Sequence, residues 1–130
     1  MTKAAVVSSS APKAIGPYSQ AVRAGDFLFC SGQIPLVPET GAMIEGDVAV
    51  QCTRVMDNLT AVLGAAGASW GDVVKTTIFL TDLRNFDAVN AVYAQYVGDV
   101  APARATVQVA ALPKGAAVEI EALAYLQRKP

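Results

Sequence analysis

The sequence predicts an α+β fold in which two helices pack on one face of a mixed six-stranded β-sheet. Six short segments have the alternating or β-branched pattern that is typical of strands, and two longer segments repeat apolar residues at helical spacing. These elements follow one another in the order β-ββ-α-β-α-ββ. The 130 residues contain neither an internal repeat nor a linker, so we expect one domain that spans residues 1–130.

The N-terminal third supplies three of the strands. Residues 4–7 form a short apolar run that predicts an edge strand, and residues 8–16 contain the Ser, Pro and Gly residues of a loop. Residues 20–32 predict a β-hairpin, because Gly25 and Asp26 separate two strand-like runs.

The end of this hairpin is the first candidate binding site. Ser31 and Gly32 place a hydroxyl group and a backbone without a side chain at a strand terminus, where a ligand could approach closely. The alternative reading is a plain β-bulge before Pro35.

The first helix should begin after Asp47, a residue type that caps helix N-termini well, and should follow a loop over residues 35–46. Gly64 and Gly67 mark its end. Its apolar stripe consists of Cys52, Val55, Met56, Leu59, Val62, Leu63 and Ala66. The β-branched run over residues 72–81 then predicts a strand. One face of that strand carries Val74, Thr76, Ile78 and Leu80.

The second helix is expected to be capped within residues 82–85 and to run to about Val97. Its apolar stripe consists of Phe86, Val89, Tyr93 and Tyr96. Asn90 lies at the flank of this stripe. An amide at such a position is either a solvated surface residue or a ligand contact, and the pattern leaves both readings open.

The C-terminal stretch, residues 102–121, reads as two strands joined by a turn at residues 112–115. Side chains alternate with period two, so the first strand has an apolar face, expected to be core, that carries Ala105, Val107, Val109 and Ala111. The polar side of the strand pair carries Arg104, Thr106 and Gln108 together with Glu119 and Glu121.

A hairpin of this kind would place Gln108 opposite Glu119, and would leave Arg104 roughly 13 Å further along the strand. Arg104 and Glu119 therefore do not meet within one hairpin. If they serve one site, another element or another subunit must bring them together. The alternative is a strand pair with a solvated polar edge.

The composition excludes several kinds of chemistry. The chain contains no histidine, which rules out a Ser-His-Asp triad, a Cys-His dyad and every histidine-ligated metal site. The net charge is −1 and the pI is about 5.2, so we expect no nucleic-acid partner. The hydrophobic fraction of 53% with only 16% charged residues indicates additional surface buried between subunits.

Cys30 and Cys52 are predicted to be reduced, buried thiols, with a disulfide as the minor alternative. The N-terminal residues lack the apolar core of a signal peptide, and no segment has the length of a membrane span. We therefore expect a cytoplasmic protein without a membrane partner.

Several motifs occur together in one order along almost the whole chain. They are GPYSQ at 16–20, SGQIP at 31–35, Asn90 with Tyr93, PAR at 102–104, and LPKG at 112–115 followed by VEIE at 118–121. Each motif alone is weak, but the ordered set closely resembles the reactive-intermediate deaminase family, called RidA or YjgF-like.

The resemblance implies a chorismate-mutase-like fold, a homotrimer with pockets at the subunit interfaces, and no cofactor. It also implies hydrolysis of 2-imino acids and their enamine tautomers, such as 2-aminoacrylate and 2-iminobutanoate, to 2-keto acids and ammonia.

The family pattern assigns residue roles by position. Arg104 matches the arginine that binds the substrate carboxylate, and Glu119 matches the glutamate that positions the attacking water. Substrate-binding positions of the family fall on Tyr18, Ser31, Gly32, Asn90 and Thr106. Many bacterial members carry Cys where this chain has Thr106, which counts against a role for a thiol there but leaves a backbone role open.

The residues also fit this chemistry on their own terms. A guanidinium group binds a planar carboxylate through two parallel hydrogen bonds, and a carboxylate can orient water for addition to a C=N bond. Two other functions remain as alternatives: an RNA-cleaving translation inhibitor, and a non-catalytic small-molecule-binding module that uses the same pocket.

Overall fold

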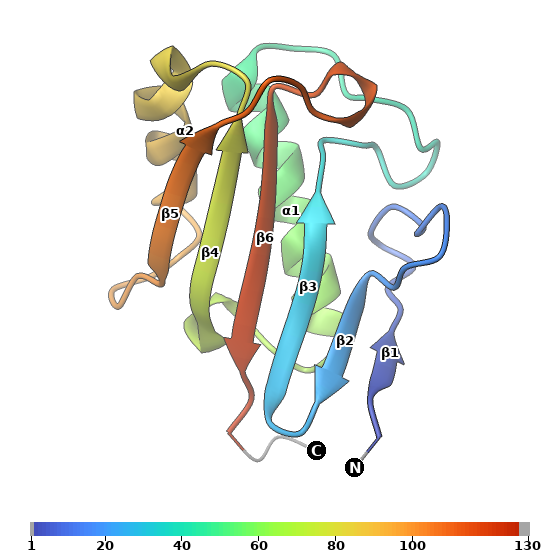
Figure 1. Cartoon of the computed structure of the whole chain (residues 1–130). Helices are drawn as coiled ribbons and strands as arrows, with labels where there is room; N and C mark the ends of the chain where they lie inside the picture. The colour runs from blue at the N-terminus through green and yellow to red at the C-terminus, as the bar shows by residue number, and fades with distance from the viewer. Residues whose placement is uncertain (1, 128–130) are drawn as a thin grey trace.

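The computed structural model describes residues 2–127, and it confirms the predicted α+β fold with its mixed six-stranded sheet. Both helices lie on one face of the sheet, and the other face has no helical cover (Figure 1). The strands are β1 (Ala4–Val6), β2 (Ala21–Ala24), β3 (Phe27–Gln33), β4 (Val73–Leu80), β5 (Ala103–Gln108) and β6 (Val118–Tyr125). The helices are α1 (Val48–Ala65) and α2 (Phe86–Tyr93), and single 3₁₀ turns occupy residues 70–72, 83–85 and 113–115.

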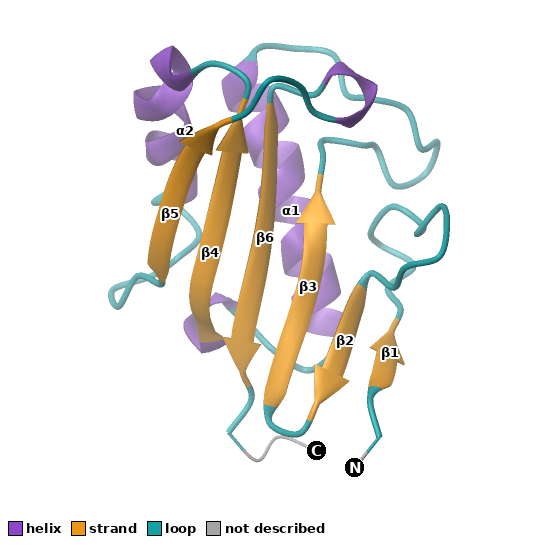
Figure 2. Ribbon diagram, viewed as in Figure 1, coloured by secondary structure: helices purple, strands orange, loops and turns teal. Residues whose placement is uncertain are grey.

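The first helix follows the prediction from the sequence. The Asp47 side chain accepts a hydrogen bond from the backbone N–H of Val50 at 3.0 Å, which satisfies one of the free donors of the first turn. The buried side chains of α1 include Cys52, Val55, Met56, Leu59, Val62 and Leu63. This stripe packs behind β3 and β6 (Figure 2).

The second helix is shorter than expected. α2 ends at Tyr93 rather than near Val97. The N–H groups of Gln95 and Tyr96 bond to carbonyls three residues earlier, at 3.0 Å each, so the chain tightens into turns of the 3₁₀ type. Val97 nevertheless stays buried.

The predicted C-terminal hairpin is wrong. The sheet order is β1-β2-β3-β6-β4-β5, so β4 lies between β5 and β6. The crossover through α2 returns the chain parallel to β4, and this makes β5 an edge strand. β6 then enters between β3 and β4, antiparallel to both, where its backbone is paired along both edges.

Arg104 and Glu119 do not share a polar side of the sheet. Arg104 pairs with Thr76, and Glu119 pairs with Phe79. Paired residues on neighbouring strands project to the same face, and residues three apart on one strand project to opposite faces. Arg104 therefore points toward the helices, and Glu119 points toward the open face.

The predicted apolar core face of β5 is also wrong. Ala105 and Val107 lie on the open face of the sheet, where Val107 is 41% exposed. The same face exposes a cluster of aromatic rings from Phe27, Phe29 and Tyr125, with the centroids of Phe27 and Tyr125 5.4 Å apart. A single chain thus leaves apolar side chains uncovered over the central strands as well as at the edge.

Val74 is another local exception. It was expected to share a face with Thr76, Ile78 and Leu80, which are buried, but it is 44% exposed. The pairing of β4 with β6 shifts register between Val73 and Lys75. An irregularity of this kind reverses the alternation, so Val73 is buried in place of Val74.

Both cysteines are free and buried, as predicted. Burial raises the pKa of Cys30 and of Cys52 to about 12, so neither thiol forms a reactive thiolate near neutral pH. Among residues 2–127, no helix is long and apolar enough to cross a membrane.

Candidate active site

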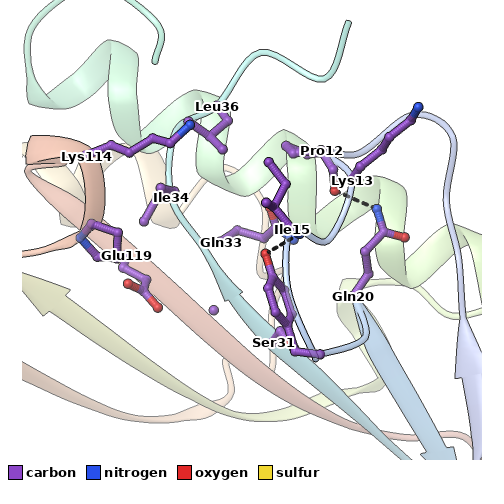
Figure 3. Close-up of a pocket in the computed structure, with 13 residues that line it drawn as sticks. Pro12, Lys13, Ile15, Gln20, Ser31, Gln33, Ile34, Leu36, Lys114 and Glu119 are labelled. Carbon is purple, nitrogen blue, oxygen red and sulfur yellow. Dashed lines mark hydrogen bonds between the residues drawn. The ribbon is translucent and has the colours of Figure 1, made fainter. Parts of the chain in front are cut away.

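A cavity of about 620 Å³ lies between the N-terminal loop, the end of β3 and the start of β6 (Figure 3). Four of the site residues predicted from the sequence line it: Tyr18, Ser31, Gly32 and Glu119. The remaining wall is formed by Pro12, Lys13, Ile15, Gln20, Gln33, Ile34, Leu36, Pro113 and Lys114. The cavity is therefore largely apolar, with one carboxylate and a few polar groups, as small-molecule sites commonly are.

The strand end at Ser31 and Gly32 is both a bulge and part of the cavity wall. The pairing of β3 with β6 shifts register between Cys30 and Gln33. The Ser31 hydroxyl donates a hydrogen bond to the Ser19 carbonyl at 2.6 Å, and the Ser31 N–H donates to the Gln20 carbonyl at 3.0 Å. A β-bulge and a strand end open to a ligand were alternatives in the sequence. In the structure they are compatible, because the bulge forms part of the cavity wall.

Gly32 gives room to the Glu119 carboxylate. A Cβ atom at position 32 would overlap Glu119 Oε2 and would lie 3.0 Å from Glu119 Cδ. Any side chain at this position would therefore displace the carboxylate from its place beside the bulge. Glycine at position 32 thus leaves the space that the carboxylate occupies.

The Glu119 carboxyl group is half-buried, and its pKa is raised. Removal from water is the larger cause, because burial disfavours the charged form, and the nearby negative charge of Glu121 adds to it. A carboxylate with a raised pKa is a stronger base than an ordinary glutamate, which suits proton transfer at a site near neutral pH.

The N-terminal loop covers one side of the cavity, and Gln20 fixes this loop. The buried Gln20 side chain accepts from the Ser8 N–H at 2.7 Å and donates to the Pro12 carbonyl at 2.7 Å. The Tyr18 hydroxyl accepts a hydrogen bond from the Ile15 N–H at 3.2 Å. Gln20 lies within the motif GPYSQ, but the sequence alone did not distinguish its role from that of its neighbours.

Arg104 lies in a separate group of residues on β5 and α2. Its guanidinium group donates a hydrogen bond to Asn90 Oδ1 at 2.8 Å. The same group lies 5.5 Å from the ring centroid of Phe86 and 5.2 Å from that of Tyr93. The Tyr93 hydroxyl in turn hydrogen-bonds Thr76 at 2.7 Å.

Asn90 is therefore a partner of Arg104 rather than a solvated flank residue. One hydrogen bond and two ring contacts hold the arginine against α2 on the helical face of the sheet, where it remains exposed. A guanidinium group has five N–H donors, so this arrangement leaves donors available for a carboxylate. Held in this way, Arg104 is preorganised to bind an anion.

Thr106 lies two residues further along β5 on the same face as Arg104. Its Oγ1 atom is buried and has no hydrogen-bond partner among residues 2–127. Thr106 does not line the cavity that contains Glu119.

The structure thus divides the predicted site residues into two half-sites. The carboxylate half-site contains Tyr18, Ser31, Gly32 and Glu119, and the arginine half-site contains Asn90, Arg104 and Thr106. β5 forms one edge of the sheet, whereas the loop over the cavity lies beyond β2 toward the other edge (Figure 1). The described chain does not bring the two half-sites together.

No group of three or more His, Cys, Asp and Glu side chains within residues 2–127 could hold a metal ion. The polar groups available for chemistry in the two half-sites are a carboxylate, a guanidinium, an amide and hydroxyls. This set can bind an anion and activate water.

The chain belongs to the family described as Endoribonuclease L-PSP, whose model matches residues 8–126 and which includes the RidA and YjgF-like proteins. Protein DfrA of Myxococcus xanthus is 58% identical, over 95% of this chain and 96% of that protein. The human 2-iminobutanoate/2-iminopropanoate deaminase is 46% identical, over 92% and 87%. The crystal structure of RidA from an Antarctic Psychrobacter superposes with a TM-score of 0.90 at 45% identity, over 94% and 98%.

Proposed function

We propose that this protein hydrolyses 2-imino acids and their enamine tautomers, such as 2-aminoacrylate and 2-iminobutanoate, to 2-keto acids and ammonia without a cofactor. The observation that carries this proposal is the half-buried Glu119 carboxylate, which has a raised pKa and faces a largely apolar cavity. The naming of relatives as 2-iminobutanoate/2-iminopropanoate deaminase and Reactive Intermediate Deaminase A supports it.

The reaction requires a group that binds the substrate carboxylate and a base that activates water. Arg104 binds the substrate carboxylate through two parallel hydrogen bonds, while Asn90 keeps the guanidinium group oriented. Glu119 orients a water molecule and accepts its proton as the oxygen adds to the carbon of the C=N bond. That proton passes to the imine nitrogen, which gives a carbinolamine. The hydroxyl proton of the carbinolamine is then transferred to the nitrogen as the C–N bond breaks, so that ammonia leaves and the C=O bond forms.

We further propose that the protein is a homotrimer whose pockets lie at the subunit interfaces. In one chain Arg104 lies on the helical face of the edge strand β5, whereas Glu119 lies on the open face of the interior strand β6. A head-to-tail contact can join the Arg104 group of one copy to the Glu119 cavity of the next. Such contacts close into a ring. The exposed apolar residues on the open face supply surface that this assembly would bury.

A coupled assay tests the proposed reaction. An amino-acid oxidase generates a short-lived imine, and the disappearance of the imine is followed with and without the protein. We expect the protein to accelerate hydrolysis in proportion to its concentration. An unchanged rate would contradict the proposed enzyme and would leave the non-catalytic binding module as the better account of the pocket.

RNA cleavage is the second candidate, because the family description names an endoribonuclease. The net charge of −1 argues against it, since binding to the phosphate backbone depends on clustered Lys and Arg. Incubation with single-stranded RNA at low salt separates the two functions. We expect no cleavage under conditions that support imine turnover.

The steric role of Gly32 gives the first mutational prediction. Gly32→Ala should lower imine turnover by roughly ten-fold or more, because the added Cβ displaces the Glu119 carboxylate by more than the precision that catalysis tolerates. Gly64→Ala is the matched control, since a Cβ at this position in α1 meets nothing within 4 Å. The control should be as active as the parent and slightly more stable. Equal activity of both variants would remove Gly32 from the site.

The open face gives a prediction about assembly. Sedimentation equilibrium at micromolar concentration should give about three times the chain mass of 13.5 kDa. Phe29→Glu should shift the protein toward smaller species, because Phe29 is 52% exposed on the face that we expect to be covered. Val50→Glu is the control, because Val50 is 41% exposed on α1, on the helical side. A monomeric parent protein would contradict both the trimer and the shared pocket.

A further inference from the structure

Lys114 is held in an uncommon backbone conformation at the rim of the cavity. Its φ and ψ angles are 57° and 23°, in the left-handed region that favours glycine or asparagine. Gly115 follows with a φ of 72°, so the turn at residues 113–115 places two successive residues in this region. Residues in such backbone conformations cluster at active sites and ligand sites.

The lysine side chain and the Glu119 carboxylate belong to the same wall of the cavity. Figure 3 shows Ile34 between them, with the Lys114 side chain extending toward Leu36 and the carboxylate pointing the other way along the wall. No hydrogen bond or ion pair within residues 2–127 involves the Lys114 ammonium group, which is exposed to solvent. It is therefore free to meet an anion that enters the cavity.

The cavity of a single chain is large enough for a substrate longer than the smallest imino acids. Its volume of about 620 Å³ lies within the range of sites that enclose drug-sized ligands. A substrate whose reacting carbon lies near Glu119 can extend its side chain along the apolar surface of Ile34 toward Lys114. A terminal group at that point would meet a positive charge.

We infer that Lys114 is a specificity-determining residue that binds a second carboxylate, at the end of the substrate side chain. The preferred substrate class is then the dicarboxylic 2-imino acids, of which the imine of glutamate is the simplest with a two-carbon spacer. This inference rests on the proposed function for the reaction itself. The preference for a second anion is a separate property of the cavity.

Lys13 provides a matched comparison within the same cavity. It also lines the cavity and is exposed, but in Figure 3 its ammonium group points away from the space between Ile34 and Glu119. Replacing Lys13 removes the same charge from the neighbourhood without removing a group that faces the ligand. If the lysines act only through their charge, replacing either one should weaken anion binding. If Lys114 makes a specific contact, only its replacement should do so.

The experiment measures binding of two keto acids by calorimetry at low salt. 2-Oxoglutarate and 2-oxopentanoate have the same chain length and differ in whether the chain ends in a carboxylate or a methyl group. The parent protein should bind 2-oxoglutarate roughly ten-fold more tightly, as expected for one charge-assisted contact near the surface. Lys114→Met should abolish this ratio, Lys114→Arg should keep most of it, and Lys13→Met should leave it unchanged.

A ratio near one in the parent protein, or an unchanged ratio in Lys114→Met, would overturn the inference. A ratio that falls equally in Lys13→Met would also overturn it, because the lysines would then act only as a diffuse charge. The ratio of the two affinities tests the role of Lys114, whereas imine turnover tests the proposed reaction. Imine hydrolysis without the ratio removes the role of Lys114, and the ratio without imine hydrolysis removes the proposed reaction while keeping the anion site.

Discussion

Replacing Arg104 by lysine should lower imine turnover by roughly 30- to 1,000-fold, and replacement by alanine should lower it at least as much. Lysine keeps the positive charge but cannot form two parallel hydrogen bonds with a planar carboxylate. It also cannot reproduce the contacts that orient the guanidinium group, which are the hydrogen bond to Asn90 and the cation–π contacts with Phe86 and Tyr93. The measurement is turnover of the same imine by parent and variants.

Thermal melts and sedimentation of the same samples supply the control. Arg104 is exposed on an edge strand, so its replacement removes little from the core. We expect the fold and the assembly to survive. Normal turnover in both variants would show that Arg104 is not the carboxylate receptor. Loss of activity only together with loss of assembly would make it an interface residue instead.

Replacing Glu119 by glutamine should lower turnover by roughly 100- to 10,000-fold while ligand binding persists, because glutamine has nearly the same shape but cannot accept a proton as a base. The product keto acid serves as the binding probe. Glu121→Gln is the comparison variant, since Glu121 lies two residues along β6 on the same face and is exposed. Unchanged turnover in Glu119→Gln, with the assembly intact, would remove Glu119 from the mechanism.

The pH dependence follows from the raised pKa of Glu119. Activity requires the charged form, so the rate should fall as the pH drops through this pKa. Burial and the charge of Glu121 raise this pKa. The acidic limb of the pH–rate profile, where activity is lost, should therefore lie at a higher pH than an ordinary glutamate would give. Glu121→Gln removes one of the two causes and should move the limb to lower pH. A limb that does not move would show that the charge of Glu121 has no effect on the base.

Local sequence patterns predicted the helices and strands well, because caps, periodicity and turns depend on residues within or next to each element. The cap at Asp47 and the stripe of α1 follow from the preference of aspartate for N-caps and from the helical period, and both are confirmed. The hairpin of β2 and β3 follows from Gly25 and Asp26, and the register confirms it.

The pairing of the C-terminal strands could not be derived in the same way. Two consecutive strands joined by a turn usually pair, but here β4 intervenes because the crossover through α2 makes β5 parallel to it. The alternation of β5 was read correctly, yet the assignment of its faces was reversed. Val107 looked like core because it is apolar, whereas the helices cover the face that carries Arg104.

The site was partly predictable for a related reason. A motif identifies residue types, and Tyr18, Ser31, Gly32 and Glu119 do meet in one cavity. Lys114 was not singled out, because its importance lies in a positive φ angle that the sequence LPKG does not reveal. The contact between Arg104 and Asn90 joins residues 14 positions apart across two elements, and it depends on the packing of α2 against β5.

The central claim is that one active site needs Arg104 from one copy of the chain and Glu119 from another. Complementation tests it most directly. Arg104→Ala and Glu119→Gln chains, each inactive alone, are denatured together in equal amounts and refolded, and imine turnover is measured. Random assortment in a ring gives about a quarter of the interfaces both native residues, so turnover should return to about a quarter of the parent value. A mixture that stays inactive, although tagged chains co-purify, would contradict the shared site.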